Sequence, residues 1–146
     1  MNIIDLIKQE YQTIQRLFLE IENTQQTEKL YEFFNQISEQ ITTHYQAEEL
    51  TLYSLLSEYK DSQSLVDTAK KEHQEAILLL EEIESFSPTS LEFKTKLQEL
   101  KKTVQTHLQP QGNTILERAQ TLINKQEQEQ LGKEFVSIKN KLQAAM

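Results

Sequence analysis

The sequence contains no cysteine and no tryptophan, and it has only two glycines and two prolines in 146 residues. Without cysteine, the chain can form neither a disulfide framework nor a thiolate metal site, and it has no cysteine nucleophile. The shortage of glycine and proline leaves little turn chemistry, whereas the abundant glutamine, glutamate, lysine and leucine are good helix formers. These absences predict long helices joined by short connections.

Basic residues are also few, because 15 Lys and Arg stand against 23 Asp and Glu, giving a formal net charge of -8. Such a surface repels the phosphate backbone of nucleic acids and anionic lipid headgroups. Residues 1–20 hold no uninterrupted apolar stretch like that of a signal peptide, and no later segment has the apolar length of a membrane span. We therefore expect a cytoplasmic protein that binds neither nucleic acid nor membranes.

Apolar residues recur at steps of three and four along five segments, which is the spacing of one face of an α-helix. The expected helices cover residues 4–21, 27–59, 66–83, 88–122 and 126–143. Ser87 is expected to cap the fourth helix with Pro88 in its first turn, and Pro110 to kink it. The fifth helix is expected to pack Leu131 and Phe135 on the others. Short connections favour antiparallel neighbours, so we predict one all-α domain over residues 1–146, an up-down-up-down antiparallel four-helix bundle with a short C-terminal fifth helix.

Polar side chains interrupt these apolar stripes at positions that face the expected core. They are Tyr11, His44, Glu48, His73, His107 and Gln111, and they include every histidine of the chain. A spacing of four places His44 with Glu48, and His107 with Gln111, on one face of a helix. Because neighbouring helices are antiparallel, the three histidines are expected at similar depth, where they can converge on one point.

Burying a carboxylate and several imidazoles without partners is costly, and a bound cation would offset that cost. Imidazole with carboxylate suits Fe, Mn or Zn. The predicted metal ligands are therefore His44, Glu48, His73 and His107, with Tyr11 as a candidate phenolate ligand. The alternative for Tyr11 is an ordinary core aromatic whose hydroxyl bonds to Glu48 or to a water molecule.

Four segments carry a resemblance to a known family, and together they extend over almost the whole chain. They are IIDLIKQEYQTIQRLF, HYQAEELTLYSLL, KKEHQEAILLLEEIE and HLQPQGNTILERAQ. In this order they resemble the hemerythrin HHE cation-binding family, whose bundle carries His on the first helix, His-x-x-x-Glu on the second, His on the third and His-x-x-x-Glu on the fourth. The resemblance implies a non-haem iron protein with a hemerythrin-like fold.

The resemblance also assigns roles to residues, and two positions depart from the family pattern. It implies that the ligands of a di-iron site are His44, His73 and His107, with Glu48 as a bridging carboxylate. Tyr11 stands where the family has a histidine, and Gln111 stands where it has a second bridging carboxylate. These changes lower the ligand count and the negative charge available for two cations, so the expected cofactor is one or two iron ions, or a single Fe, Mn or Zn.

Two functions follow from this pattern. The first is a metal-binding protein that binds oxygen or nitric oxide or senses iron. The alternative is a structural or protein-interaction module that has kept the fold and lost the metal, with the buried polar groups in a hydrogen-bonded network. We predict that the chain is not an enzyme and assign no catalytic residue, because no histidine follows a glutamate by three residues, as in di-iron carboxylate enzymes, and no Gly-x-Ser-x-Gly motif is present.

Overall fold

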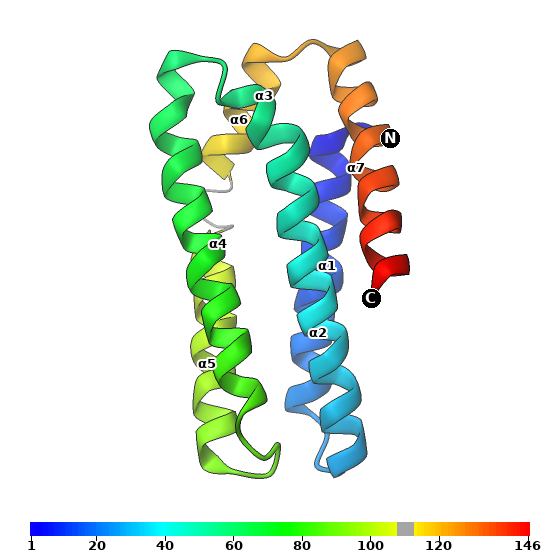
Figure 1. Cartoon of the computed structure of the whole chain (residues 1–146), viewed down its shortest axis with the longest axis vertical. Coiled ribbons are helices and arrows are strands. Elements are labelled where there is room, and N and C mark those ends of the chain that lie inside the picture. The colour runs from blue at the N-terminus through cyan, green and yellow to red at the C-terminus, as the bar shows by residue number, and fades with distance from the viewer. Residues whose placement is uncertain (108–112) are drawn as a thin grey trace.

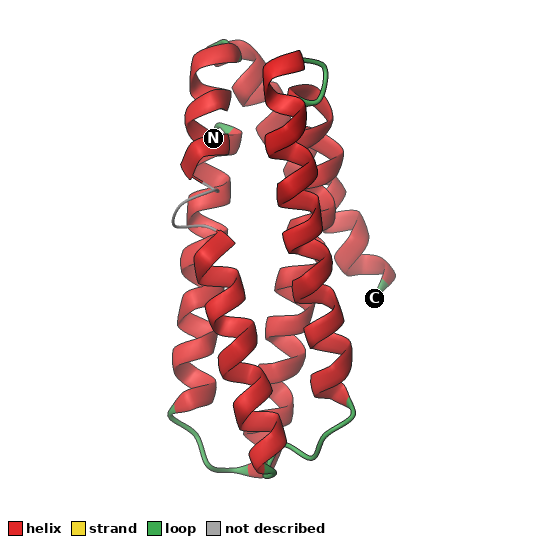
Figure 2. Cartoon of the chain, turned by 90° about the vertical axis from the view of Figure 1, so that its left-hand side faces the viewer, coloured by secondary structure: helices red, strands yellow, loops and turns green. Residues whose placement is uncertain are grey.

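The computed structural model describes residues 1–107 and 113–146, and all regular secondary structure in these residues is helical. Figure 2 shows the helices extending along the molecule and the loops gathered near its ends. The prediction of an all-α chain is confirmed for this part of the sequence. None of the described helices combines the length and the apolar character that crossing a membrane requires.

The long helices lie side by side and run roughly parallel to the long axis of the molecule (Figure 1). In chain order the helices are α1 (Ile3–Glu22), α2 (Thr27–Glu48), α3 (Ser54–Leu56), α4 (Gln63–Glu84), α5 (Leu91–Thr106), α6 (Asn113–Leu122) and α7 (Lys125–Ala145). A π-helical turn, η1 (Glu49–Tyr53), joins α2 to α3, and a 3-10 turn, η2 (Lys60–Ser62), precedes α4. In Figure 1, α1, α2, α4 and α5 alternate in direction, and α7 lies against α1 and α2.

The start of α5 differs from the prediction. We expected Ser87 to cap this helix, but α5 begins at Leu91 and its cap is Ser90, whose hydroxyl accepts a hydrogen bond from the Phe93 amide at 3.2 Å. The carbonyl of Ser87 instead accepts from the Ser90 amide in the preceding turn. The serine nearest the apolar stripe therefore satisfies the free amides of the first helical turn.

One of the predicted helices is divided into shorter elements. The segment expected as one helix over 27–59 contains the π-helical turn η1 between α2 and α3. The described residues of the segment expected over 88–122 include α5 and α6. The predicted kink at Pro110 and the predicted ligand position Gln111 lie outside the described residues.

Buried apolar side chains form two separate clusters rather than one continuous core. The first lies toward the α1–α2 and α4–α5 connections and includes Ile14, Phe34, Leu80 and Leu100. The second lies toward α3 and α6 and includes Ile7, Leu52, Val66 and Ile115. Between them the buried residues of α2, α4 and the end of α5 are polar, namely His44, Glu48, His73 and His107. We call these four residues the polar layer.

Helix α7 covers one side of the bundle at the height of the polar layer. Leu131 and Phe135 are buried, as expected for the fifth helix. Gly132 faces the first residues of the chain so closely that a Cβ atom there would collide with the carbonyl oxygen of Met1 and approach the Ile3 amide nitrogen to 3.2 Å. The backbone contact at Gly132 therefore allows α7 to lie close to the start of α1.

The substitution Gly132→Ala tests this contact. Alanine normally stabilises a helix interior relative to glycine by roughly 1 kcal/mol. Here the added methyl group meets backbone atoms that cannot turn aside, and we expect a loss of about 1–3 kcal/mol in the free energy of unfolding. Urea unfolding followed by circular dichroism measures the change.

The matched control is Ser137→Ala on the exposed face of the same helix. Alanine also has the higher helix propensity at this position, but its side chain contacts no backbone of another segment. The free energy of unfolding of this variant should therefore stay within about 0.5 kcal/mol of that of the parent protein. A Gly132→Ala protein more stable than the parent would show that α7 does not pack as described.

Candidate metal centre

The polar layer collects side chains from three separate parts of the chain. His44 and Glu48 lie one turn apart on α2, His73 lies on α4, and His107 directly follows α5. Their exposed fractions are 2%, 4%, 2% and 3%, so all four are withdrawn from water. Antiparallel neighbours with short connections bring these distant positions to the same height, as their spacing predicts.

Three of these residues point ligand atoms at one place. The Nε2 atoms of His73 and His107 are 3.1 Å apart, and Oε1 of Glu48 is 3.1 Å from Nε2 of His73. One ligand atom from each of the three residues lies within 4.8 Å of the others. Glu48, His73 and His107 are therefore arranged as a set of metal ligands, and we call them the inner cluster.

His44 lies on the other side of the Glu48 carboxylate. Its Nε2 is 3.8 Å from Oε2 of Glu48, whereas Oε1 faces His73. The two oxygens of Glu48 thus face different histidines. His44 belongs to the same buried layer but not to the inner cluster.

Tyr11 has a partner other than Glu48. It is half-buried, and its hydroxyl accepts a hydrogen bond from Nε2 of Gln15, one turn later on α1. Gln15 in turn accepts from Gln105 on α5 at 3.2 Å. The role of Tyr11 as a metal ligand stays a prediction.

Each histidine uses its outward nitrogen to bind a half-buried carboxylate. The Nδ1 pairs are His44 with Glu10 at 2.7 Å, His73 with Glu49 at 2.8 Å, and His107 with Glu72 at 2.7 Å. A proton on Nδ1 that is donated to a carboxylate leaves the Nε2 lone pair directed inward, which is the usual arrangement of metal-bound histidines. We call Glu10, Glu49 and Glu72 the outer carboxylates.

The outer carboxylates were not predicted from the sequence. The chain has many glutamates at half-exposed helical positions, and nothing in their spacing marks the ones that meet a histidine of another helix. Two lie next to recognised residues, Glu49 after Glu48 and Glu72 before His73. This adjacency in sequence is the one indication of their role. It can be interpreted only when it is known which helices lie next to each other.

The close approach of the two Nε2 atoms requires a positive charge between them. If both Nδ1 atoms carry protons, two Nε2 lone pairs would face each other at 3.1 Å and repel. Burial disfavours the charged form of His73, but the carboxylates of Glu48 and Glu49 outweigh it and raise the pKa of His73. Burial, together with the charge on His73, lowers the pKa of His107. Without a metal, one proton on His73 therefore occupies the place that a cation can take.

Glu48 is the negative group of the inner cluster. Burial alone would raise its pKa, but the positive field of the three histidines lowers the pKa of Glu48 to about 2, so it is a carboxylate at neutral pH. Its Oε1 is buried 3.1 Å from Nε2 of His73 and meets the geometry of a hydrogen bond with none of the described residues. A buried carboxylate oxygen without a hydrogen-bond partner is a position that a cation would satisfy.

Aromatic rings hold the histidines in place. Tyr45 stacks on His73 with ring centroids 3.7 Å apart and planes at 7° to each other. Tyr53 also lies nearly parallel to His73, at 5.3 Å and 16°, and Phe135 of α7 meets the edge of His44 at 5.7 Å. These contacts limit ring rotation and keep water out of the layer.

A lysine of α7 completes the surroundings of His44. Lys139 is only 7% exposed, and its ammonium donates to Glu10 and, at 2.8 Å, to Gln40. Since Glu10 binds His44, α7 is connected to the polar layer through Lys139 and Glu10. Lys139 could not be predicted from the sequence, because a lysine that follows an apolar stripe by one turn usually reaches solvent.

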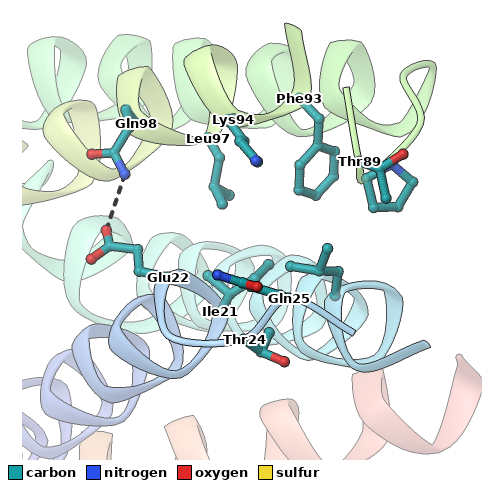
Figure 3. Close-up of a pocket in the computed structure, with 11 residues that line it drawn as sticks. Ile21, Glu22, Thr24, Gln25, Thr89, Phe93, Lys94, Leu97 and Gln98 are labelled. Carbon is teal, nitrogen blue, oxygen red and sulfur yellow. Dashed lines mark hydrogen bonds between the residues drawn. The ribbon is translucent and has the colours of Figure 1, made fainter. Parts of the chain in front are cut away.

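The polar layer is distinct from a cavity of about 670 Å³ between the α1–α2 connection and the start of α5. Figure 3 shows Ile21, Phe93 and Leu97 among its lining residues, and Gln98 donates to Glu22 across it at 3.2 Å. This cavity lies at the opposite end of the bundle from α3 and α6. It contains no residue of the polar layer.

The fold and the inner cluster define a helical protein with a buried candidate cation site. The family model for the hemerythrin HHE cation binding domain matches residues 2–119. The chain therefore belongs to the hemerythrin HHE family, and the resemblance noted in its sequence is confirmed.

Two individual proteins are similar to this chain. The chain is 32% identical over 146 residues to a protein named DNA nickase from Nostoc sp. (strain PCC 7120), and the match covers 98% of this chain and 40% of that protein. It thus spans about two fifths of the length of this relative. The crystal structure of a hemerythrin HHE cation binding domain-containing protein from Mycobacterium kansasii matches 99% of this chain and 89% of its own, with a TM-score of 0.82 and 18% identity, and shows the same fold.

Removing the ammonium of Lys139 tests the connection between α7 and the polar layer. In Lys139→Met, the half-buried Glu10 carboxylate loses its buried cation, and we expect a loss of roughly 3 kcal/mol in the free energy of unfolding. Chemical unfolding followed by circular dichroism measures it.

Lys101→Met is the matched control. Lys101 binds Glu22 at 2.7 Å between helices, but both side chains are more than a fifth exposed. Solvent screens this pair, so the control should lose less than about 1 kcal/mol. Equal losses in the two variants would contradict a buried role for Lys139.

Proposed function

We propose that the protein binds a single transition-metal ion, most simply iron, between Glu48, His73 and His107. The observation that carries this proposal is the separation of 3.1 Å between two inward Nε2 atoms beside a buried carboxylate oxygen. Membership of a cation-binding family supports it. In this proposal residues 1–146 form one domain, an up-down-up-down four-helix bundle with α7 as the fifth helix, and the chain is a metal-binding protein rather than an enzyme.

The spacing of the ligand atoms suits a metal of ordinary bond length. Metal–ligand bonds to imidazole nitrogen and carboxylate oxygen of about 2.1 Å place tetrahedral ligand atoms roughly 3.4 Å apart. The separations of 3.1 Å within the inner cluster are close to that value. Small rotations of the side chains are enough to bring the ligand atoms onto a metal.

The donor atoms restrict which metal fits. Two imidazoles and a carboxylate without thiolate are typical ligands of Fe, Mn or Zn. An iron ion held by so few protein ligands would have open coordination positions that could bind oxygen or nitric oxide. Alternatively, occupancy of the site would depend on the iron concentration, and the protein would act as an iron sensor. Binding of oxygen or nitric oxide and iron sensing are the functions that we propose for this site.

One ion is proposed rather than two because the second half of the layer is poor in ligands. On that side His44 faces Oε2 of Glu48 at 3.8 Å. The family position for another imidazole holds Tyr11, which bonds to Gln15. The position of the second bridging carboxylate is Gln111, outside the described residues, and a neutral amide is a weak ligand.

The residues around the inner cluster have separate tasks in this proposal. The outer carboxylates Glu49 and Glu72 fix the ring orientations of His73 and His107. They also make the Nε2 atoms stronger electron-pair donors to a metal. The stacked ring of Tyr45 and the burial of the layer keep water away. A bound cation would take the place of the proton between the two histidines, and that proton would pass to solvent.

The name of the Nostoc relative, DNA nickase, describes a longer protein of which this chain matches 40%. The net charge of -8 disfavours contact with a phosphate backbone. We therefore propose metal binding, and not DNA binding, as the function of this chain.

The proposal is tested by metal content and by the strength of metal binding. Protein purified without an affinity tag or chelator should contain about one equivalent of metal per chain by elemental analysis. Glu72→Gln should weaken metal binding by about 10–100-fold, because the amide no longer accepts the His107 proton as a carboxylate does.

Glu75→Gln is the matched control, since Glu75 is exposed on the same helix. It removes the same charge and should leave the affinity unchanged. Protein that binds no metal, either as purified or on titration, would overturn the proposal in favour of a module that has lost its metal.

Metal affinity should also depend on pH in a defined direction. The pKa of His73 is raised above its ordinary value of 6.5, so the competing proton is still bound at pH 6.5. Affinity for Zn²⁺ should therefore keep rising as the pH increases beyond 6.5, by about tenfold per pH unit while one proton is displaced. Calorimetric titration at a series of pH values measures it, and an affinity that is constant from pH 6 upward would contradict the proton-sharing arrangement.

A further inference from the structure

A fourth donor atom lies beside the inner cluster and is assigned to the site by neither sequence nor comparison. The hydroxyl oxygen of Tyr53 is 3.5 Å from Nε2 of His73 and 3.4 Å from Nε2 of His107. Tyr53 is 1% exposed, so no solvent competes for this oxygen. We propose that Tyr53 is a further metal ligand, binding as a phenolate together with Glu48, His73 and His107. This inference rests on the proposed function.

The distances from the Tyr53 oxygen resemble those within the inner cluster. A ligand set around one ion of ordinary bond length has neighbouring atoms roughly 3.4 Å apart. The Tyr53 oxygen meets this requirement toward both histidines at once, at 3.4 and 3.5 Å.

The π-helical turn explains how Tyr53 reaches the site. Residues five apart in a regular α-helix lie on different faces, because a turn contains 3.6 residues. In η1 the Ser54 amide bonds to the Glu49 carbonyl, five residues earlier, so the turn is wider. The wider turn brings Tyr53 to the same side as Glu48, five residues before it. Single π-helical turns are frequently found at functional sites.

A phenolate would also supply a negatively charged ligand that the site lacks. The family positions for an imidazole and for a carboxylate hold Tyr11 and Gln111, so one anionic ligand is missing. On metal binding the O–H bond of Tyr53 breaks, the oxygen keeps the electron pair and binds the metal, and the proton passes to solvent. No electron is transferred. Glu48 and Tyr53 would then bring two negative charges to the ion, which favours Fe(III).

Tyr53 differs from the other two tyrosines near the layer. The hydroxyl of Tyr11 accepts from Gln15 on its own helix. Tyr45 contacts His73 through the face of its ring. Both are suitable controls, and Tyr11 is also the phenolate candidate that the sequence suggested.

The experiment is visible spectroscopy of the full chain loaded with Fe(III), with iron content measured on the same samples. The parent protein should hold about one iron per chain and show a phenolate-to-iron(III) charge-transfer band with tyrosine modes in resonance Raman spectra. Tyr53→Phe should retain iron but lose this band by more than tenfold. Tyr45→Phe and Tyr11→Phe should keep it.

Each contrary result has a distinct meaning. An iron-loaded parent protein without the band, or a band that disappears in Tyr11→Phe and persists in Tyr53→Phe, overturns the assignment of Tyr53 and leaves the metal site standing. A parent protein that binds no metal overturns the proposed function as well. If Tyr53→Phe does not fold, the parent protein is labelled with deuterated tyrosine instead. The Raman modes of a tyrosine ligand must shift on labelling, and a spectrum without such modes rejects Tyr53 as a ligand. Labelled Tyr11→Phe and Tyr45→Phe proteins that keep the modes leave Tyr53 as their source.

Discussion

The structure depends on one constraint, which is that two imidazole nitrogens, one from α4 and one from the residue after α5, are held 3.1 Å apart in a buried region. Two lone pairs cannot stay at that distance unless a proton or a cation lies between them. The carboxylate of Glu48 beside them makes that positive charge favourable, and the apolar clusters on either side exclude solvent that would screen it. The arrangement is therefore either a proton-sharing pair or a metal site, according to what is present.

The surrounding groups are arranged in successive layers around this pair. The outer carboxylates bind the Nδ1 atoms, the rings of Tyr45 and Tyr53 lie against His73, and η1 brings Glu49 and Tyr53 to the same histidine. On the other side, α7 reaches His44 through Lys139 and Glu10, and this helix lies beyond the residues matched by the family model. The bundle thus supports an inner ligand set on one side and a hydrogen-bonded, ligand-poor half on the other.

The parts of this arrangement that the sequence predicts are those that depend on local periodicity. The stripes of spacing three and four indicated the helices, and the four residues of the polar layer interrupted them in core register. What escaped prediction depends on contacts between helices: the outer carboxylates and Lys139 resemble ordinary surface residues until their neighbours are known. Tyr53 was missed for a different reason, because a regular helix would turn it away from Glu48 and only the π-helical turn brings it back. The helix cap was predicted at Ser87 but lies at Ser90, because two serines three residues apart can both cap a helix.

The central claim is that one ion binds between His73 and His107. It is tested most directly by anomalous diffraction from crystals of the metal-loaded protein, recorded on both sides of the metal absorption edge. The account predicts one anomalous peak within bonding distance of both Nε2 atoms and of the Glu48 carboxylate. A fully loaded crystal with no peak there, or with its metal beside His44 instead, would contradict it.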